Sequence, residues 1–233
     1  MSPLVIHNGT PLHVAGSDTA ARGLIVLQEA FGVNDHIRDV AERFAAQGFY
    51  AVAPVLFHRT GSAEIAYDDF GNAMTHMGAL NREDLTTDVS AAAGYLVAQG
   101  FSRASIGVVG YCMGGTVALF TGTLGLVGAA VSFYGGGVST GRFGLPSLIE
   151  LAPTLQSPWL GLYGDLDRGI PVDDVEALRA AAATSGQTTD IVRYADGDHG
   201  FHCDGRPDVF NPSAAADAAA RATTFLTESL SAR

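Results

Sequence analysis

Short apolar runs alternate with longer amphipathic segments along most of the chain. Apolar runs of this length are typical of strands buried on both faces, and the longer segments carry the helical period. The pattern predicts strands at 4–7, 12–15, 23–28, 49–53, 105–110, 128–134, 158–163 and 189–195. It predicts helices at 35–47, 82–99, 113–124, 171–184 and 213–231. Ser213, which follows Pro212, is expected to cap the last helix.

This alternation predicts an α/β fold with a mostly parallel central sheet flanked by helices on both faces. The first two strands are short and can form an antiparallel edge. No repeat, low-complexity tract or linker divides the chain, so a single domain over residues 1–233 is expected. Residues 58–81 fit neither the helical nor the strand period, and we expect an irregular insertion that covers a site.

The composition excludes several classes of function. All 13 basic residues are arginine, so P-loop nucleotide binding, a pyridoxal phosphate Schiff base and a lysine-dependent aldolase are ruled out. The formal net charge of −11 opposes binding to nucleic acid or to anionic membranes. The chain shows no dinucleotide fingerprint, and no cofactor is expected. Two cysteines, no recognisable signal peptide and no run long enough to cross a bilayer indicate a cytoplasmic protein.

Cys112 is the first candidate for chemistry. It lies in "GVVGYCMGGTVALF", between the predicted strand 105–110 and the predicted helix 113–124. In an open parallel sheet, sites form beyond the carboxyl ends of the strands, which is where this turn is expected. The position favours a nucleophile. The alternative is a small core residue beside a flexible glycine run.

The residues around Cys112 fit a nucleophile on a strained strand-to-helix turn. Such a turn needs small neighbours that let the helix approach the sheet closely, and three glycines supply them, Gly110, Gly114 and Gly115. The N–H of Met113 opens the helix and can point at a developing oxyanion. The positive end of the helix also favours thiolate over thiol.

A thiol nucleophile needs a base, and the base needs an orienting acid. His199 stands in "YADGDHGF" after the strand 189–195, and two aspartates stand in "LYGDLDRGIP" after the strand 158–163. The order nucleophile, acid, histidine is the order this fold requires. Asp167 is favoured as the acid, because Asp165 is tight against the strand end and can cap the turn instead.

Two further motifs resemble functional sites, a serine nucleophile and a metal site. "GVSTG" places Ser139 in a serine-hydrolase pattern, but the sequence after it cannot start a good helix, so the glycines indicate loop flexibility. "HGFHC" adds His202 and Cys203 beside His199, but too few other ligands stand close by in the sequence. No metal site is expected.

With these residues assembled, the sequence resembles the dienelactone hydrolase family of the α/β-hydrolase superfamily. The matching segments span nearly the whole chain, namely "QEAFGVN" (28–34), "GYCMGG" (110–115), "GDLDRGIP" (164–171) and "DHGF" (198–201). The resemblance implies Cys112 as nucleophile, His199 as base and Asp167 as the acid that orients it.

The resemblance also implies roles outside these three residues. Glu29 would contact the cysteine and help convert it to thiolate when substrate binds, although a cap on the turn before "FGVN" is the alternative. The N–H of Ala30 would be a second oxyanion donor beside Met113. Arg59 and Arg206 would hold a substrate carboxylate, and either could instead be a solvated surface arginine.

Two departures concern this last role. Arg206 does not stand at the family's usual spacing from His199, and Val55 replaces the aspartate that often follows Pro54.

These expectations together describe a cysteine-dependent hydrolase of small esters or lactones, acting through a thioester intermediate on substrates that can carry a carboxylate. One alternative is a broader carboxylesterase or a peptidase on the same scaffold. Another is a non-catalytic protein that binds a ligand or senses thiol chemistry.

Overall fold

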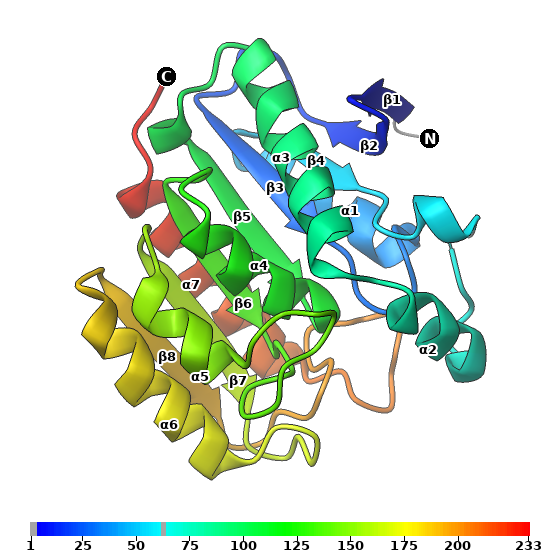
Figure 1. The fold of residues 1–233 in the computed structure, drawn as a ribbon, viewed down its shortest axis with the longest axis vertical. Helices are drawn as coiled ribbons and strands as arrows, with labels where there is room; N and C mark the ends of the chain where they lie inside the picture. The colour runs from blue at the N-terminus through cyan, green and yellow to red at the C-terminus, as the bar shows by residue number, and fades with distance from the viewer. Residues whose placement is uncertain (1–3, 62–63) are drawn as a thin grey trace.

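The eight strands predicted from the sequence all form, and they join one sheet (Figure 1). The computed structural model describes residues 4–61 and 64–233. The strands are β1 Leu4–His7, β2 Thr10–Ala15, β3 Arg22–Leu27, β4 Phe49–Pro54, β5 Ile106–Tyr111, β6 Ala129–Phe133, β7 Trp159–Gly164 and β8 Thr189–Tyr194. Their order across the sheet is β1-β2-β4-β3-β5-β6-β7-β8.

The pairing of these strands confirms the predicted α/β fold with a mostly parallel sheet. β1 pairs antiparallel with β2, and β2 pairs antiparallel with β4, which gives the antiparallel edge expected from the sequence. From β4 to β8 in the sheet order, each strand is parallel to the next. The turns that follow β3, β5, β7 and β8 therefore lie on one rim of the sheet.

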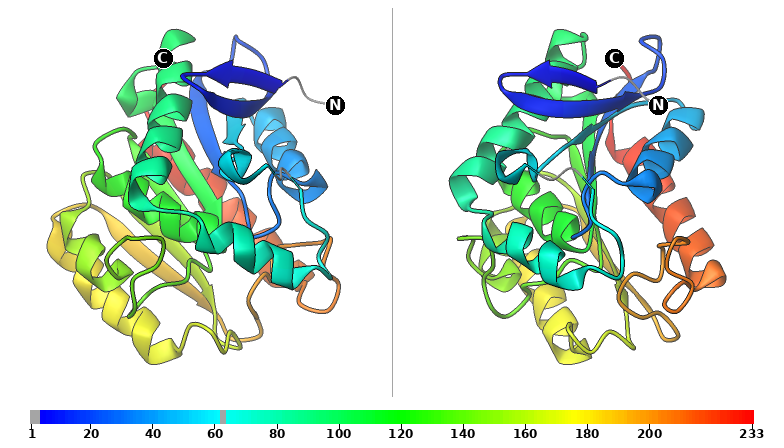
Figure 2. Two further views of the ribbon diagram at one scale, coloured as in Figure 1. Left: turned by 45° about the vertical axis from the view of Figure 1, so that its right-hand side comes forward. Right: turned by 90° about the vertical axis from the view of Figure 1, so that its right-hand side faces the viewer.

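Helices cover both faces of the sheet (Figure 2). One layer contains α1 (Asp35–Ala46) and α7 (Pro212–Ser229), and the other contains α3 (Arg82–Ala98), α4 (Met113–Thr123), α5 (Leu148–Leu151) and α6 (Val172–Ala182). β4, β5, β6 and β7 are buried at every position because both of their faces are covered, which explains their continuous apolar sequence. In the described part of the chain, no helix has the length and apolar character needed to cross a membrane.

The second half of the segment 58–81 is a helix, α2 (Phe70–Gly78), so the prediction of an irregular insertion is wrong there. Asp69 caps this helix, since its side chain accepts a hydrogen bond from the N–H of Asn72. Only a few of its positions are buried, and exposed apolar residues such as Phe70 hide the helical period in the sequence.

The stretch before α2 packs on the turn that follows β3. The N–H of Ile65 donates to the carbonyl of Phe31 at 3.0 Å, and the ring of Tyr67 lies edge-on to that of Phe31 with centroids 4.7 Å apart. These contacts join the segment to the rim where the functional residues are expected.

The cap of α7 differs from the expectation. Asn211, not Ser213, is the N-cap, because the Asn211 side chain accepts from the N–H of Ala214 and Pro212 occupies the first helical position.

The N-terminus of α4 lies against the sheet so closely that only glycine fits. A Cβ on Gly110 would stand 1.9 Å from the carbonyl oxygen of Gly114, and a Cβ on Gly114 would stand 2.5 Å from the carbonyl oxygen of Leu27. A Cβ on Gly115 would stand 2.6 Å from the carbonyl oxygen of Phe133. The prediction that these three glycines allow close approach of helix and sheet is confirmed.

Gly110→Ala should therefore destabilise the fold by about 1–3 kcal/mol or more, because the obstacle is backbone that cannot rotate away. Urea unfolding monitored by circular dichroism measures this cost. Gly71→Ala in α2 is the matched control, since a Cβ there meets nothing within 4 Å, and it should be neutral or stabilise by less than about 1 kcal/mol. Equal stability of the two variants would contradict the steric account.

Candidate active site

Cys112 lies on a strained turn between β5 and α4. Its backbone has φ 55° and ψ −118°, a left-handed conformation that is uncommon for a residue with a side chain. The N–H of Cys112 donates to the carbonyl of Phe133 at 3.1 Å, which ties the turn to the end of β6. The strained backbone expected at this position is confirmed, and strain of this kind is typical of functional turns.

The structure places His199 between Cys112 and Asp167, at hydrogen-bond distance from both. The Cys112 Sγ lies 3.0 Å from His199 Nε2, and His199 Nδ1 lies 2.6 Å from Asp167 Oδ2. The Asp167 side chain is 3% exposed, and its other oxygen accepts from the N–H of Gly169 at 2.8 Å. The carboxylate is thus fixed from both sides and holds the imidazole toward the sulfur.

The surroundings of His199 favour its charged form. Burial lowers the pKa of His199, but the Cys112 sulfur and the Asp167 carboxylate outweigh burial and hold this pKa well above its ordinary value of 6.5. The ring of Tyr134 packs edge-on against the imidazole, with centroids 5.2 Å apart. The His199 imidazole can therefore accept the proton of the Cys112 thiol and remain charged.

Asp165 is turned away from His199. Its two oxygens accept from Nε and Nη2 of Arg193 at 2.7 and 2.8 Å. These hydrogen bonds lower the pKa of Asp165 and use its carboxylate in a surface ion pair. Asp167, the aspartate favoured from the sequence, is the one that reaches the histidine.

Glu29 is buried beside the triad but does not bond to the thiol in this conformation. Its Oε1 accepts from the hydroxyl of Tyr134 at 3.1 Å, and its Oε2 has no hydrogen-bond partner among the described residues. Burial raises the pKa of Tyr134 well above 10, so the phenol keeps the proton that it donates to Glu29. The sequence analysis missed Tyr134, whose only signal is its position directly after β6 on the same rim.

The two residues expected to donate to an oxyanion follow the carboxyl ends of β3 and β5, which are neighbours in the sheet. Met113 is the first residue of α4, so its N–H has no partner within the helix. Ala30 follows the end of β3, where the side chain of Gln28 donates to the carbonyl of Glu29 at 3.3 Å and accepts from the N–H of Leu56 at 2.9 Å. Gln28 thereby fixes the peptide that precedes Ala30.

Arg59 is already paired with two aspartates of α3. Its Nη1 and Nη2 donate to the two oxygens of Asp88 at 2.7 and 3.1 Å, and its Nε lies 3.0 Å from Asp84. Asp88 is buried and also accepts from Thr10 at 2.7 Å. The expectation that Arg59 holds substrate gains no support from this arrangement, because the guanidinium is occupied in joining the loop after β4 to α3.

Arg206 lies beside the loop that carries His199. Its guanidinium carbon stands 5.6 Å from the centroid of the Phe31 ring, directly after Ala30, and a Cβ on Gly200 would come within 2.8 Å of its Nη1. It therefore borders the turn next to His199. Two more arginines, Arg142 and Arg168, line a cavity of about 370 Å³ that also contacts His199 and Asp167.

The remaining candidates have structural partners. The hydroxyl of Ser139 is exposed and donates to Asp174 of α6 at 2.6 Å. His202 is buried against the ring of Tyr111, and burial lowers the pKa of His202 to about 3, which keeps the imidazole neutral.

Comparison with known proteins agrees with the sequence resemblance. The sequence model of the dienelactone hydrolase family matches residues 12–230. Two proteins named "Putative carboxymethylenebutenolidase" are 33% identical to this chain, one from Methylorubrum extorquens and one from Salmonella typhimurium. The matches cover 79% and 85% of this chain. They cover 64% of the Methylorubrum protein, just under two thirds of its length, and 74% of the Salmonella protein.

Solved structures show the same likeness. The crystal structure of a "Putative Dienelactone Hydrolase" from Klebsiella pneumoniae superposes with a TM-score of 0.85 at 29% identity, and the match covers 94% of this chain and 93% of that one. The Klebsiella protein therefore has the fold described above.

Substituting Arg59 separates a structural role from a substrate-binding role. Arg59→Gln leaves the buried Asp88 without its bidentate partner and should lower the free energy of unfolding by about 1–3 kcal/mol in urea denaturation. Arg206→Gln, which removes a half-exposed guanidinium, should cost much less. A stable Arg59→Gln variant with a raised KM would instead assign Arg59 to substrate.

The contact between Asp167 and His199 predicts a shift in protonation. Asp167→Asn should lower the pKa of His199, because the carboxylate is one of the groups that raise it. The imidazolium of the wild type should therefore persist to a higher pH than that of the variant. Titration of ¹⁵N-labelled histidine by NMR measures the difference. Asp165→Asn is the control and should leave the His199 titration unchanged; a shift there of equal size would contradict the assignment.

Proposed function

The chain belongs to the dienelactone hydrolase family, and on this premise we propose that it hydrolyses small esters or lactones with Cys112 as nucleophile. The observation that carries the proposal is the alignment of the Cys112 sulfur, the His199 imidazole and the Asp167 carboxylate at 3.0 and 2.6 Å. The strained backbone of Cys112 and the first N–H of α4 beside it support the same role. The family places the chain among hydrolases, and the nucleophile and the intermediate are our proposal.

The first half of the reaction forms a thioester. His199 holds the thiol proton, and the thiolate sulfur attacks the carbonyl carbon while the carbonyl π electrons move to oxygen. The N–H groups of Ala30 and Met113 stabilise the oxyanion. When the oxyanion collapses, the bond from carbon to the alcohol oxygen breaks and that oxygen takes the proton from His199.

The second half releases the acid. His199 removes a proton from water, and the hydroxide attacks the thioester carbon to give a second oxyanion in the same position. Its collapse breaks the carbon–sulfur bond and regenerates the Cys112 thiolate beside the His199 imidazolium. The carboxylate of Asp167 stabilises this imidazolium in both halves of the reaction.

We assign Glu29 to the control of thiolate formation. In the described conformation its carboxylate bonds to Tyr134 and not to the thiol. A side-chain rotation toward Cys112 when substrate binds would let the carboxylate take the thiol proton, which leaves the sulfur as thiolate. The proton then passes to the His199 imidazole. Tyr134 then acts as the partner that holds Glu29 back in the absence of substrate.

The proposed substrates are compact and can carry a carboxylate. Arg206 borders the turn at Phe31, and Arg142 and Arg168 line the cavity beside His199. A guanidinium binds a carboxylate with two parallel hydrogen bonds, so these three arginines are the candidates for its recognition. The name of the curated relatives describes a lactonase whose substrate bears a carboxymethylene group, which is consistent with this proposal.

The experiment combines two substrates with one alkylating agent. The protein should hydrolyse p-nitrophenyl acetate and a dienelactone, and iodoacetamide should abolish both activities. Cys112 is half-buried whereas Cys203 is 0% exposed, so intact-mass spectrometry should find one adduct, on Cys112. Cys112→Ser should keep the fold by circular dichroism and lose turnover by at least about 100-fold, because a hydroxyl is not ionised by this environment.

Other outcomes lead elsewhere. Turnover of p-nitrophenyl acetate alone would favour a broader carboxylesterase. Absence of turnover on both substrates, or turnover that survives complete alkylation of Cys112, would refute the cysteine mechanism.

A further inference from the structure

A second cluster of reactive side chains lies on the other side of Glu29. A carboxylate oxygen of Glu29, a ring nitrogen of His36 and the Sγ of Cys203 all lie within 4.8 Å of one another. The three residues are 1%, 5% and 0% exposed. They come from the end of β3, the first turn of α1 and the loop after β8, so the fold and not the local sequence brings them together. The proposed hydrolysis uses only Glu29 among them.

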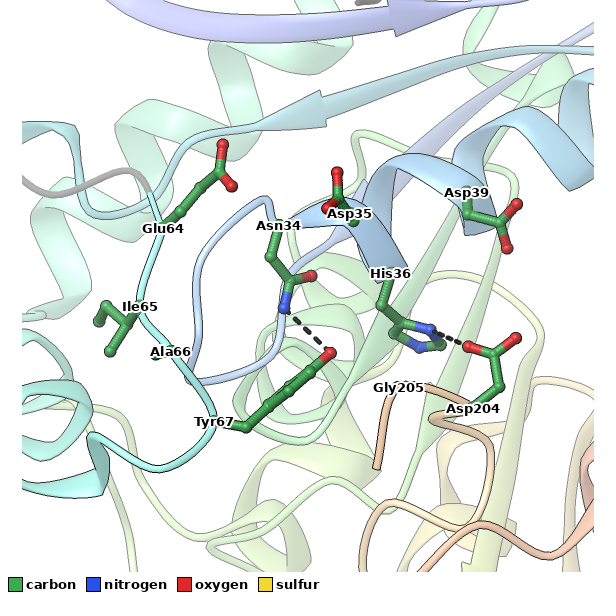
Figure 3. Close-up of a pocket in the computed structure, with 10 residues that line it drawn as sticks. All are labelled: Asn34, Asp35, His36, Asp39, Glu64, Ile65, Ala66, Tyr67, Asp204 and Gly205. Carbon is green, nitrogen blue, oxygen red and sulfur yellow. Dashed lines mark hydrogen bonds and ion pairs between the residues drawn. The ribbon is translucent and has the colours of Figure 1, made fainter. Parts of the chain in front are cut away.

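Two polar atoms in this cluster are buried without a partner. Glu29 Oε2 and His36 Nε2 have no hydrogen bond among the described residues. The other ring nitrogen of His36, Nδ1, lies 3.0 Å from Asp204 Oδ1 (Figure 3). A carboxylate can only accept, so Nδ1–H is the donor in this contact, and the free Nε2 of a neutral imidazole is a metal-ligand atom. A buried polar atom without a partner costs about 1–3 kcal/mol, so two of them in one cluster call for an explanation.

We propose that Glu29, His36 and Cys203 form a zinc site. Carboxylate oxygen, imidazole nitrogen and thiolate sulfur are all ligands that Zn²⁺ takes in proteins, and three protein ligands leave a fourth position for water. Zinc binds these atoms at about 2.0–2.3 Å, so movements of about 1 Å in the side chains close the set. On binding, the thiol of Cys203 becomes a thiolate and its proton passes to solvent.

The surroundings of the cluster fit a cation. The contact between His36 and Asp204 is the carboxylate–histidine pair that commonly orients a zinc ligand. The Cys203 sulfur lies at hydrogen-bond distance, 3.3 Å, from the Tyr67 hydroxyl, and the Asn34 side chain donates to that hydroxyl at 3.1 Å. These contacts position the sulfur.

An acidic pocket of about 460 Å³ borders the cluster and provides access (Figure 3). His36 and Tyr67 line it, together with four carboxylates, Asp35, Asp39, Glu64 and Asp204. Arg38 pairs with Asp35 and Glu64, and Arg43 pairs with Asp39 and Asp204, so the four carboxylates exceed the two arginines in charge and still favour the approach of a cation. A metal ion can therefore approach His36 from this pocket.

One consequence rests on the proposed function. A zinc ion bound to Glu29 Oε2 holds the carboxylate away from Cys112, and the rotation that forms the thiolate is then blocked. Zinc should therefore inhibit hydrolysis through Cys203 and His36, which take no part in the reaction itself.

Cobalt absorption tests the site without reference to activity. Reduced, chelator-treated protein titrated with CoCl₂ should develop a thiolate-to-cobalt charge-transfer band that saturates at one ion per chain and disappears when ZnCl₂ is added. Cys112→Ser should retain the band, and Cys203→Ser should lose it. His36→Gln should weaken binding strongly, and Asp204→Asn should weaken it by about 10–100-fold.

His76→Gln is the matched control. His76 is a buried histidine outside the cluster, bonded to Thr60 at 2.6 Å, and its substitution should leave the cobalt band unchanged. Circular dichroism without metal establishes that each variant is folded, and His36→Gln carries the test if Cys203→Ser does not fold. A band that is lost in Cys112→Ser, or absent from the wild type, would overturn the proposal.

Turnover with zinc then tests the link to Glu29 separately. Zinc should lower the rate of p-nitrophenyl acetate hydrolysis in the wild type and spare it in Cys203→Ser. A cobalt band with unaffected turnover would keep the metal site and refute the inhibition. A cobalt band in a protein that hydrolyses neither substrate would keep the metal site and refute the proposed hydrolysis.

Discussion

The close contact between the start of α4 and the carboxyl ends of β3, β5 and β6 is the constraint on which the site depends. Three glycines permit it, Gly110, Gly114 and Gly115, because backbone carbonyl groups occupy the space that a Cβ would need. The contact fixes the helix so close to the sheet that Cys112 must adopt a positive φ, and its side chain then projects above the rim. The first N–H groups of α4 lie directly after Cys112 at the same rim.

Carboxylates in this protein divide by the partner that each one has. Asp88 and Asp165 are paired with arginines and join elements of the scaffold. Asp167 has a histidine as its partner, and the same negative charge there raises the basicity of an imidazole that touches a thiol. Among the described residues, the Glu29 side chain bonds only to a phenol, and no arginine pairs with it. A carboxylate in that state is available for movement or for a metal.

The sequence predicts the parts of the structure that follow from local pattern. Every strand, the parallel arrangement and the antiparallel edge follow from apolar periodicity, and the contact of Cys112 with His199 and Asp167 follows from placing each on a loop after a strand. Side-chain pairing across the fold does not follow in this way. Arg59 has no partner nearby in the sequence, because its aspartate partners stand on α3. Asn211 is the N-cap in place of Ser213, because the helix already begins at Pro212. His36 and Cys203 are far apart in the chain, so the spacing rules that detect a metal site do not apply to them.

At the rim where these residues lie, positions set by the sheet stand beside surface loops that can change in length. Cys112, His199 and Asp167 follow the ends of strands whose positions are set by the sheet, whereas other segments, such as the one that carries α2, run over the surface. Lengthening a surface loop costs little conformational entropy. Descendants of such a chain can therefore acquire new specificity by insertion at this rim while the reacting atoms keep their places.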